Sequence, residues 1–423
     1  MKLNPFFLSL LKSYGKFVSL LLHPKAPENT GDFVPVMRFI ITSDTHITTI
    51  GDIQSSRLQK MIKLGYRIAG KDKNYKKLDA VLVAGDVTDM GTKIGHGSVP
   101  AAVKTVIKNG TQFLATISTS HDDRNVGKAS LEIYKNLMGQ ETDFHRVING
   151  FHFIGISASK TEKDHYDENQ KQWLINELDK AVADDSKKPV FVLQHEHISN
   201  TVYGSSDFEG WGMPDFAQIL KKYPQVVDFS GHSHYPINDA RSIWQGEYTA
   251  LGTGGLYYAE ITVDDVKTVH PDHYRMVSTF WLVEVDKNNS IRMRAVDLQT
   301  CKYLCEYNLA DAYERKYTPE KQKMRSKAPV FRADTSVKIR KNKITFDSAE
   351  SADGMPIFIY RAFTSDKNGN LTPIGKTVPM YYRYKVPSSV TIKTENIPSD
   401  AVAIEIVAEN CYGMRSEPVT VKI

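Results

Sequence analysis

Short β-rich apolar runs alternate with amphipathic stretches of about a dozen residues from Val36 onward, and this alternation constrains the fold most strongly. Strands and helices in alternation favour a layered α/β fold, because each element has an apolar face to bury. The clearest helix is predicted over Glu168–Asp184, with Asp167 as its capping residue and Gln170 three positions on. The expected strands are Arg38–Ser43, Ala80–Ala84, Gln112–Ile117, Phe151–Ile156, Pro189–Gln194 and Val226–Phe229, with a hairpin of Thr279–Val285 and Ile291–Val296.

The pattern changes toward the C-terminus. Residues 310–328 are rich in Lys, Glu and Gln and include Pro319, which is typical of a linker. Residues 329–423 contain short alternating runs between turn signals and no helical period, which predicts a second, smaller all-β sandwich domain. The predicted organisation is an N-terminal amphipathic helix in residues 1–33, an α/β domain in residues 34–309, the basic linker and the β-sandwich.

The beginning of the chain is apolar but interrupted. Residues 6–22 are rich in Phe and Leu, yet Lys12 and Lys16 break the run before it reaches the roughly 18 residues of a spanning helix. The segment also lacks the small-residue cleavage site of a secretory signal. Both lysines share one helical face, so residues 6–22 either contact a membrane peripherally or pack against protein. We expect a cytoplasmic location, with membrane association as an alternative, and leave the oligomeric state open.

Charge is modest overall and uneven along the chain. The 423 residues carry 54 Lys and Arg against 49 Asp and Glu, and a net charge of +5 argues against nucleic acid as a partner. Residues 314–344 alone contain eleven basic and three acidic residues, so the remainder is slightly acidic. Three cysteines are too few for a disulfide framework.

Five short clusters of metal-capable residues follow one another along the α/β domain, and four of them directly follow an apolar strand. Loops at the carboxyl ends of strands are where an α/β sheet gathers its site, so these residues are expected to converge. Imidazole and carboxylate groups without a nearby thiolate suit a divalent ion such as zinc, manganese or iron. The clusters are Asp44-Thr45-His46, Gly85-Asp86-Val87-Thr88-Asp89, Ser120-His121-Asp122, His195 with His197, and Gly231-His232-Ser233-His234.

Together, the clusters resemble the pattern of the calcineurin-like metallophosphoesterase superfamily, over about residues 36–309. The resemblance implies a four-layer α-β-β-α sandwich. It also implies metal-dependent hydrolysis of a phosphomonoester or phosphodiester at two divalent ions of Mn, Fe or Zn, with Asp86 bridging them. It places Asp44, His46 and His234 at one ion and Ser120, His195 and His232 at the other, where Ser120 replaces the family's asparagine.

Further residues are expected beside the ions. His121 matches the family's histidine that protonates the leaving group, and Asp122 is expected to orient it. Arg124 either binds a phosphate oxygen of the substrate or is a solvated surface residue. His197 is expected to assist substrate binding. Because a hydroxyl is a poorer ligand than an amide carbonyl, Ser120 motivates a second hypothesis: a degenerate phosphoesterase fold that serves as a non-catalytic binding scaffold.

The remaining segments carry weaker signals. Residues 203–212 lie between two of the clusters and are expected to line the mouth of the site. The C-terminal domain loosely resembles a fibronectin type III or immunoglobulin-like module, chiefly in residues 408–413 and 416–419. Such a module either binds a partner or packs on the larger domain.

Overall fold

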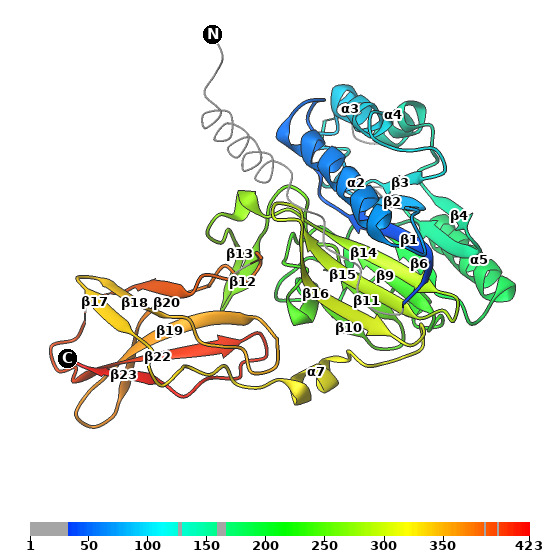
Figure 1. The fold of residues 1–423 in the computed structure, drawn as a ribbon. Helices are drawn as coiled ribbons and strands as arrows, with labels where there is room; N and C mark the ends of the chain where they lie inside the picture. The colour runs from blue at the N-terminus through cyan, green and yellow to red at the C-terminus, as the bar shows by residue number, and fades with distance from the viewer. Residues whose placement is uncertain (1–32, 126–128, 159–165, 385, 396) are drawn as a thin grey trace, which may run out of the picture.

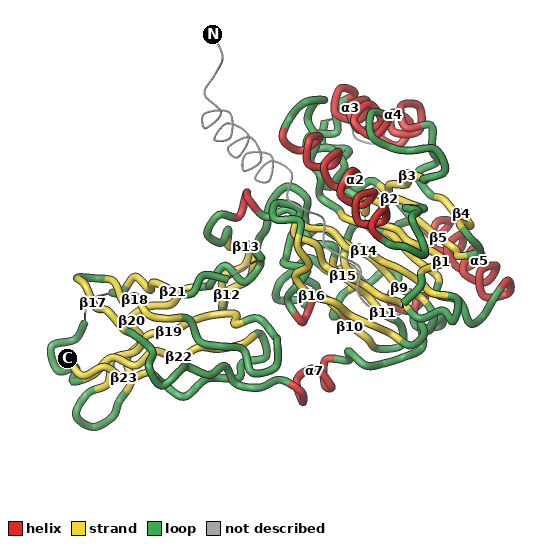
Figure 2. The backbone as a smooth tube through the Cα atoms, in the orientation of Figure 1, coloured by secondary structure: helices red, strands yellow, loops and turns green. Residues whose placement is uncertain are grey.

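The computed structural model describes residues 33–423, except 126–128, 159–165, 385 and 396. Two six-stranded mixed sheets face each other in the larger part of the molecule, with helices on their outer sides (Figure 1; Figure 2). This four-layer α-β-β-α arrangement confirms the predicted fold class. The amphipathic helix predicted in residues 1–33 falls on a segment of which residues 1–32 lie outside the described residues. No helix in the described part of the chain is long and apolar enough to cross a bilayer.

The first sheet carries its helices on the side that faces away from the second sheet. Its elements are β1 (Pro35–Thr42), β2 (Ala80–Ala84), β3 (Gln112–Thr116), β14 (Thr279–Asp286), β15 (Ile291–Asp297), β16 (Lys302–Leu309), α2 (Ile53–Lys71), α3 (Lys93–Lys104) and α4 (Ala129–Met138). The strand order is β16-β15-β14-β1-β2-β3, in which β1, β2 and β3 are parallel and the others antiparallel. Apolar residues of α2, α3 and α4 share one buried cluster with these strands.

The second sheet follows the same plan. Its elements are β4 (Phe144–Ile148), β5 (Phe151–Gly155), β6 (Val190–Leu193), β9 (Val226–Ser230), β10 (Ile243–Gln245), β11 (Thr249–Gly252), α5 (Glu168–Asp184) and α6 (Ala217–Leu220). The order is β10-β11-β9-β6-β5-β4, with the four central strands parallel. Helix α5 has the predicted bounds, and its start is fixed by reciprocal hydrogen bonds between Asp167 and Gln170.

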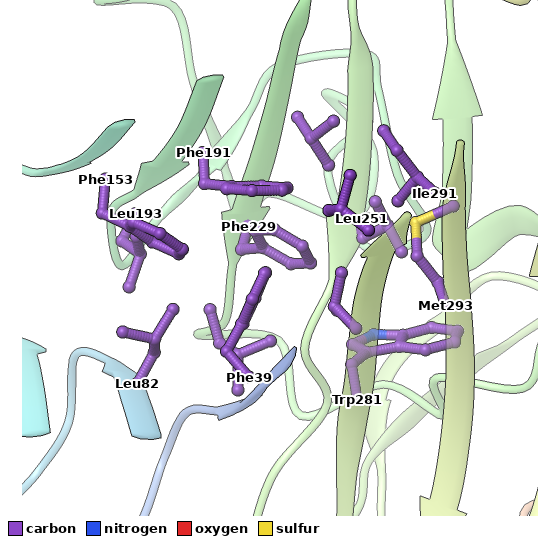
Figure 3. Packing of buried hydrophobic residues seen from close by; sticks show 14 of the residues in the cluster. Phe39, Leu82, Phe153, Phe191, Leu193, Phe229, Leu251, Trp281, Ile291 and Met293 are labelled. Carbon is purple, nitrogen blue, oxygen red and sulfur yellow. The ribbon is translucent and has the colours of Figure 1, made fainter. Parts of the chain in front are cut away.

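Aromatic rings fill the space between the two sheets (Figure 3). Phe39 of β1 packs its ring against Phe191 of β6, Phe153 of β5 and Phe229 of β9, at centroid distances of 4.8, 5.2 and 6.0 Å. All three contacts are edge-to-face, which is a favourable geometry for aromatic pairs. Strands from both sheets are therefore held in a fixed relation through one residue of β1.

A buried carboxylate holds three arginines on neighbouring strands. Glu284 of β14 accepts hydrogen bonds from Arg38 Nε at 2.6 Å, from Arg292 Nη2 at 2.7 Å and from Arg294. All four side chains are almost completely buried. Burial alone would raise the pKa of Glu284, but the guanidinium groups outweigh it and hold the pKa below its ordinary value.

The C-terminal domain has the predicted β-sandwich form. Its strands are β17 (Val337–Arg340), β18 (Lys343–Asp347), β19 (Ile357–Ser365), β20 (Leu371–Thr377), β21 (Ser389–Lys393), β22 (Ala403–Asn410) and β23 (Val419–Lys422). They form a three-stranded sheet, β17-β18-β21, and a four-stranded sheet, β20-β19-β22-β23, around one apolar cluster.

The segment predicted as a linker contains a short helix, α7 (Pro319–Arg325). The helix begins at Pro319, because Thr318 caps it and proline suits the first helical position.

The β-sandwich packs on the larger domain through a mixed apolar and polar seam. Tyr381 donates its hydroxyl to the buried Asp239 at 3.0 Å. The guanidinium of Arg241 lies over the ring of Tyr203 and also over the ring of Phe358 of β19, at 3.7 and 4.7 Å from the ring centroids.

Ion pairs also cross the seam, because Asp264 pairs with Arg361 and Lys376 of the β-sandwich. This pairing and the buried apolar cluster at the seam favour a β-sandwich that packs on the larger domain over a free module. The hairpin at this seam is β12 (Ile261–Val263) with β13 (Val266–Val269).

Glu284→Gln is expected to lower the free energy of unfolding by about 3–5 kcal/mol, because it removes the buried carboxylate that three guanidinium groups share. Urea denaturation measures the change. The control is Glu306→Gln on β16, whose side chain is exposed, and it should stay within about 0.5 kcal/mol of the wild type. Equal small effects of the two substitutions would contradict the prediction.

Asp264→Asn is expected to reduce the thermal midpoint at neutral pH and to lose its effect in acid. The hydrogen bond from Arg361, and after it the bond from Lys376, lower the pKa of Asp264 to about 2, against the ordinary value of 3.8. A depressed carboxyl pKa gives stability that is fully present above pH 3.8 and is lost as the pH falls toward 2. Calorimetry between neutral pH and pH 3 should show the gap between wild type and variant shrinking. The exposed neighbour Asp265, substituted by Asn, is the control and should show no such gap.

Candidate metal centre

The predicted clusters converge at the carboxyl ends of the parallel strands of both sheets. Asp44 and His46 follow β1, Asp86 follows β2, and Ser120 and His121 follow β3 of the first sheet. His195 follows β6, and His232 and His234 follow β9 of the second sheet. The two sheets face each other, so the five loops meet along one edge of the sandwich.

The backbone of these loops is strained. Five of the predicted ligands have positive φ angles, a region that residues with a Cβ rarely adopt. They are Asp44 (52°), His46 (49°), Asp86 (48°), His232 (70°) and His234 (57°). Gly85 directly precedes Asp86, and Gly231 directly precedes His232. Neither position has room for a side chain, since a Cβ at Gly85 would overlap the ring of His195 and a Cβ at Gly231 would overlap Ser43 and Asp44.

One group of ligand atoms gathers around His46. Asp44, His46, Asp86 and His234 each place one nitrogen or oxygen within 4.8 Å of the others, and all four are buried. His234 Nε2 lies 3.0 Å from Asp44 Oδ1 and 3.2 Å from His46 Nε2. His46 Nε2 lies 3.9 Å from both Asp44 Oδ1 and Asp86 Oδ2.

A second group shares Asp86 with the first. His195 Nε2 lies 3.3 Å from Asp86 Oδ2 and 3.1 Å from His232 Nδ1. The other ring nitrogen of His195, Nδ1, lies 3.0 Å from the carbonyl oxygen of Ala84. Donation of the Nδ1 proton to that carbonyl leaves the Nε2 lone pair directed at the group, as in a metal-binding histidine.

The geometry of both groups fits a divalent ion. Two ligands held about 2.1 Å from a tetrahedral ion lie about 3.4 Å apart, and the separations here run from 3.0 to 3.9 Å. Asp44 Oδ1 is buried, and no described donor makes a hydrogen bond to it, although His234 Nε2 is close. Their separation of 3.0 Å is short enough for two ligands of one cation.

Electrostatics keep the shared carboxylate ionised. Burial raises the pKa of Asp86, but His195, His46 and His121 outweigh burial and hold the pKa well below its ordinary value. Burial lowers the pKa of His232 to about 4, helped by the nearby His195. Burial also acts to lower the pKa of His195, but Asp86 outweighs burial and raises it well above its ordinary value, so a cation bound here would displace a proton from His195.

Ser120 lies against Asp86. Its hydroxyl donates to Asp86 Oδ1 at 2.8 Å, and the hydroxyl of Ser118 donates to the same oxygen. Ser118 was missed from the sequence because it lies outside the pattern that identifies the third cluster. The two hydroxyls fix one oxygen of Asp86 and leave Oδ2 toward His46 and His195.

His121 lies at the exposed edge of the first group, with its ring edge-on to His46 at 4.5 Å. Asp89 holds it, since the carbonyl oxygen of Asp89 lies 2.8 Å from His121 Nδ1 and the carboxylate 3.4 Å away. Asp122 was expected to orient His121. Its buried carboxylate instead accepts hydrogen bonds from the backbone of Val87, Thr88 and Ser118, and so ties two site loops together.

The two residues predicted to bind substrate are placed differently. Arg124 is exposed, and its Nη2 donates to His121 Nε2 at 3.2 Å. His197 is only 1% exposed, and its ring nitrogens are bonded to Ser230 Oγ at 2.8 Å and Ser233 Oγ at 2.7 Å. His197 therefore supports the loop of His232 from behind, because both of its nitrogens are already used.

Aromatic rings that the sequence reasoning left out flank both groups. Tyr258 stacks on His234 at 3.9 Å with an interplanar angle of 22°, and Tyr257 lies 6.0 Å from His46. Trp211 lies edge-on to His232 at 4.8 Å. Trp211 falls in the segment 203–212 that was expected at the mouth, whereas Tyr257 and Tyr258 lie outside the five predicted clusters.

Most of that mouth segment faces elsewhere. Residues 200–203, 205, 206, 208 and 209 line a cavity of about 490 Å³ at the domain seam, together with Arg241 and Phe358. Trp211 is the residue of segment 203–212 that contacts a predicted ligand, through His232.

Comparison with known proteins is consistent with this geometry. Residues 37–236 match the family model described as calcineurin-like phosphoesterase. A protein of Rhodococcus erythropolis described as a "Probable cyclic nucleotide phosphodiesterase" is 21% identical over 229 residues, which is 52% of this chain and 72% of that protein.

Among solved structures, a purple acid phosphatase isolated from yellow lupin (Lupinus luteus) seeds matches with a TM-score of 0.48 and 12% identity, over 66% of this chain. The match spans 55% of that phosphatase, little more than half its length. The family match covers all the converging loops from Asp44 to His234, and residues 37–236 of this chain are a calcineurin-like phosphoesterase domain.

Proposed function

We propose that this protein hydrolyses a phosphate ester with the help of two divalent metal ions. The observation that carries the proposal is the position of Asp86, whose Oδ2 belongs to both groups of ligand atoms. One carboxylate shared by two imidazole-rich groups is the arrangement that holds two ions close together. The family of residues 37–236 supports the same class of chemistry.

The proposed ligand sets follow from the two groups. Asp44, His46, Asp86 and His234 would hold one ion, and Asp86, His195 and His232 the other. When bound, such ions activate water, orient the phosphate and neutralise its charge. Ser120 and Ser118 anchor the shared carboxylate, so we assign Ser120 to positioning Asp86.

The protein's own groups supply the proton and bind the phosphate. His121 lies at the edge of the first group and is the candidate that protonates the departing oxygen. Asp89 fixes the Nδ1 side of its ring. Nε2 accepts a hydrogen bond from Arg124, so it can give up a proton only when the ring is protonated at both nitrogens and Arg124 has turned to the phosphate. Burial acts to lower the pKa of His121, but Asp89 and Asp86 outweigh burial and raise it, which favours the protonated ring. Arg124 is the candidate that binds a phosphate oxygen. His197 is given no contact with substrate because both of its nitrogens are bonded to serines.

A phosphodiester is the substrate class that we expect first. The Rhodococcus relative is described as a phosphodiesterase, and the rings of Tyr257 and Trp211 beside the two groups can pack against an organic ester group. A monoester remains the alternative.

With Mn²⁺ added, the protein is expected to turn over bis(p-nitrophenyl) phosphate or p-nitrophenyl phosphate. His121→Asn should lower kcat by about 10²- to 10⁴-fold, because it removes the proton donor. Asp86→Asn should abolish turnover. The control His273→Asn changes an exposed histidine outside both groups and should leave kcat unchanged.

Two results would overturn the proposed activity. One is the absence of bound metal and of turnover with added Mn²⁺, together with an Asp86→Asn variant that behaves like the wild type. The other is an inactive wild type together with an active Ser120→Asn variant. That result would favour the non-catalytic scaffold, since it would mean that the natural serine prevents catalysis.

Metal binding is expected to stabilise the fold independently of turnover. At a free Mn²⁺ concentration one hundred times its Kd, the stabilisation is about 2.7 kcal/mol, because the ion binds the assembled groups. Calorimetry should show a higher thermal midpoint with Mn²⁺ than with a chelator. Asp44→Asn should lose most of this rise, whereas Asp334→Asn, on the exposed surface of the β-sandwich, should retain it.

A further inference from the structure

Two of the outer helices of the first sheet, α2 and α3, carry basic side chains and no acidic ones. Residues 53–71, which form α2, and residues 93–112, which include α3 and the loop after it, contain no Asp or Glu. The basic residues in these two segments are Arg57, Lys60, Lys63, Arg67, Lys71, Lys93, Lys104 and Lys108. A chain with a net charge of only +5 therefore presents a local cationic surface on this layer.

A hollow of about 830 Å³ lies between α2 and the end of α3. Four of its lining residues are basic and none is acidic: Lys60, Lys63, Arg67 and Lys108. Lys63 and Lys108 are exposed, and Lys60 is half-buried. Within the described part of the chain, no carboxylate forms a salt bridge with any of these three lysines, so their charge is available to an anion from outside.

The helical spacing places these cations in line with an apolar end. Ile53, Lys60, Lys63 and Arg67 follow the i, i+7, i+10, i+14 spacing of one helix face. At 1.5 Å per residue, the stripe from Ile53 to Arg67 is about 21 Å long. Ile53, the first residue of α2, is 57% exposed.

Two more isoleucines extend the apolar end. Ile94 at the start of α3 is 68% exposed, and Ile50 before α2 is 49% exposed. They lie close together, because Ser98 Oγ accepts a hydrogen bond from the backbone nitrogen of Ile50 and donates one to the carbonyl oxygen of Ile94. Exposed branched side chains beside a cationic hollow are the combination that binds a lipid interface: the apolar groups enter it while the cations meet the headgroups.

This apolar end adjoins the metal centre. His46 is followed by Ile47, which pairs with Thr88 between the two site loops, and Ile50 comes three residues later. One helical turn after Ile53, Arg57 of α2 donates to the carbonyl oxygens of Leu256 and Tyr257, and Tyr257 flanks His46. A ligand surface bound by α2 and α3 would therefore lie beside the candidate metal centre.

We propose that the protein binds anionic membrane surfaces through this α2–α3 face, defined as Ile50, Ile53 and Ile94 with Lys60, Lys63, Arg67 and Lys108. The ligand chemistry is a phosphate-bearing headgroup at an apolar boundary. The binding does not depend on the proposed hydrolysis, because none of these residues belongs to the two ligand groups. It is also separate from any contact made by residues 6–22, since different residues would form it.

Vesicle sedimentation of the full-length chain tests the proposal. We expect the protein to sediment at low salt with vesicles of phosphatidylcholine and phosphatidylglycerol in equal parts, and to stay in solution with phosphatidylcholine alone. The triple variant Lys60→Gln, Lys63→Glu, Lys108→Glu should lower the partition coefficient more than about 100-fold, at roughly a fivefold loss for each of the three lysines removed. Ile53→Ser with Ile94→Ser should weaken binding at high salt, where the apolar part dominates.

The matched control reverses three exposed lysines of the β-sandwich, Lys338, Lys341 and Lys343, to Glu. It should bind vesicles like the wild type, and both triple variants should keep the wild-type circular dichroism spectrum and thermal midpoint. The proposal is wrong if the two triple variants lose binding equally, or if neither loses it. It is also wrong if only substitutions within residues 6–22 abolish binding, or if the α2–α3 triple variant loses affinity for inorganic polyphosphate while its vesicle binding is unchanged.

Discussion

The packing of Phe39 between the two sheets is the contact on which the site depends most directly. Its ring meets Phe153, Phe191 and Phe229, which belong to three strands of the other sheet. Edge-to-face rings fix both the spacing and the offset of the sheets. Because the ligand loops leave the ends of these strands, a shift between the sheets would separate Asp44 and Asp86 on one side from His195 on the other.

The site loops combine this rigid base with strained turns. Left-handed backbone at five predicted ligands is unfavourable, and the surrounding hydrogen bonds must hold it. Asp122 supplies part of that support by binding the backbone of two loops, and His197 supports a third through Ser230 and Ser233. Asp122 and His197 support the shape of the loops, which explains why these polar side chains are buried so close to the candidate ligands.

Charge is arranged differently on the two faces of the larger domain. At the domain seam, Asp264 pairs with Arg361 and Lys376 of the β-sandwich, and Asp239 pairs with Arg241 within the larger domain. On the α2–α3 face, Lys60, Lys63 and Lys108 form no salt bridge with a carboxylate of the described residues. Paired charges stabilise contacts within one chain, whereas a group of charges of one sign is suited to a partner of the opposite sign.

The sequence by itself determined the α/β class, the bounds of α5, the β-sandwich and the residues that meet at the candidate centre, because period, caps and short motifs are local properties. The tertiary structure decided how those residues are used. It placed Asp89 beside His121, turned Asp122 to the backbone, buried His197 and set Ser120 against Asp86. Such contacts depend on side-chain directions and on loops brought together from distant strands, and neither is encoded in the spacing of a motif.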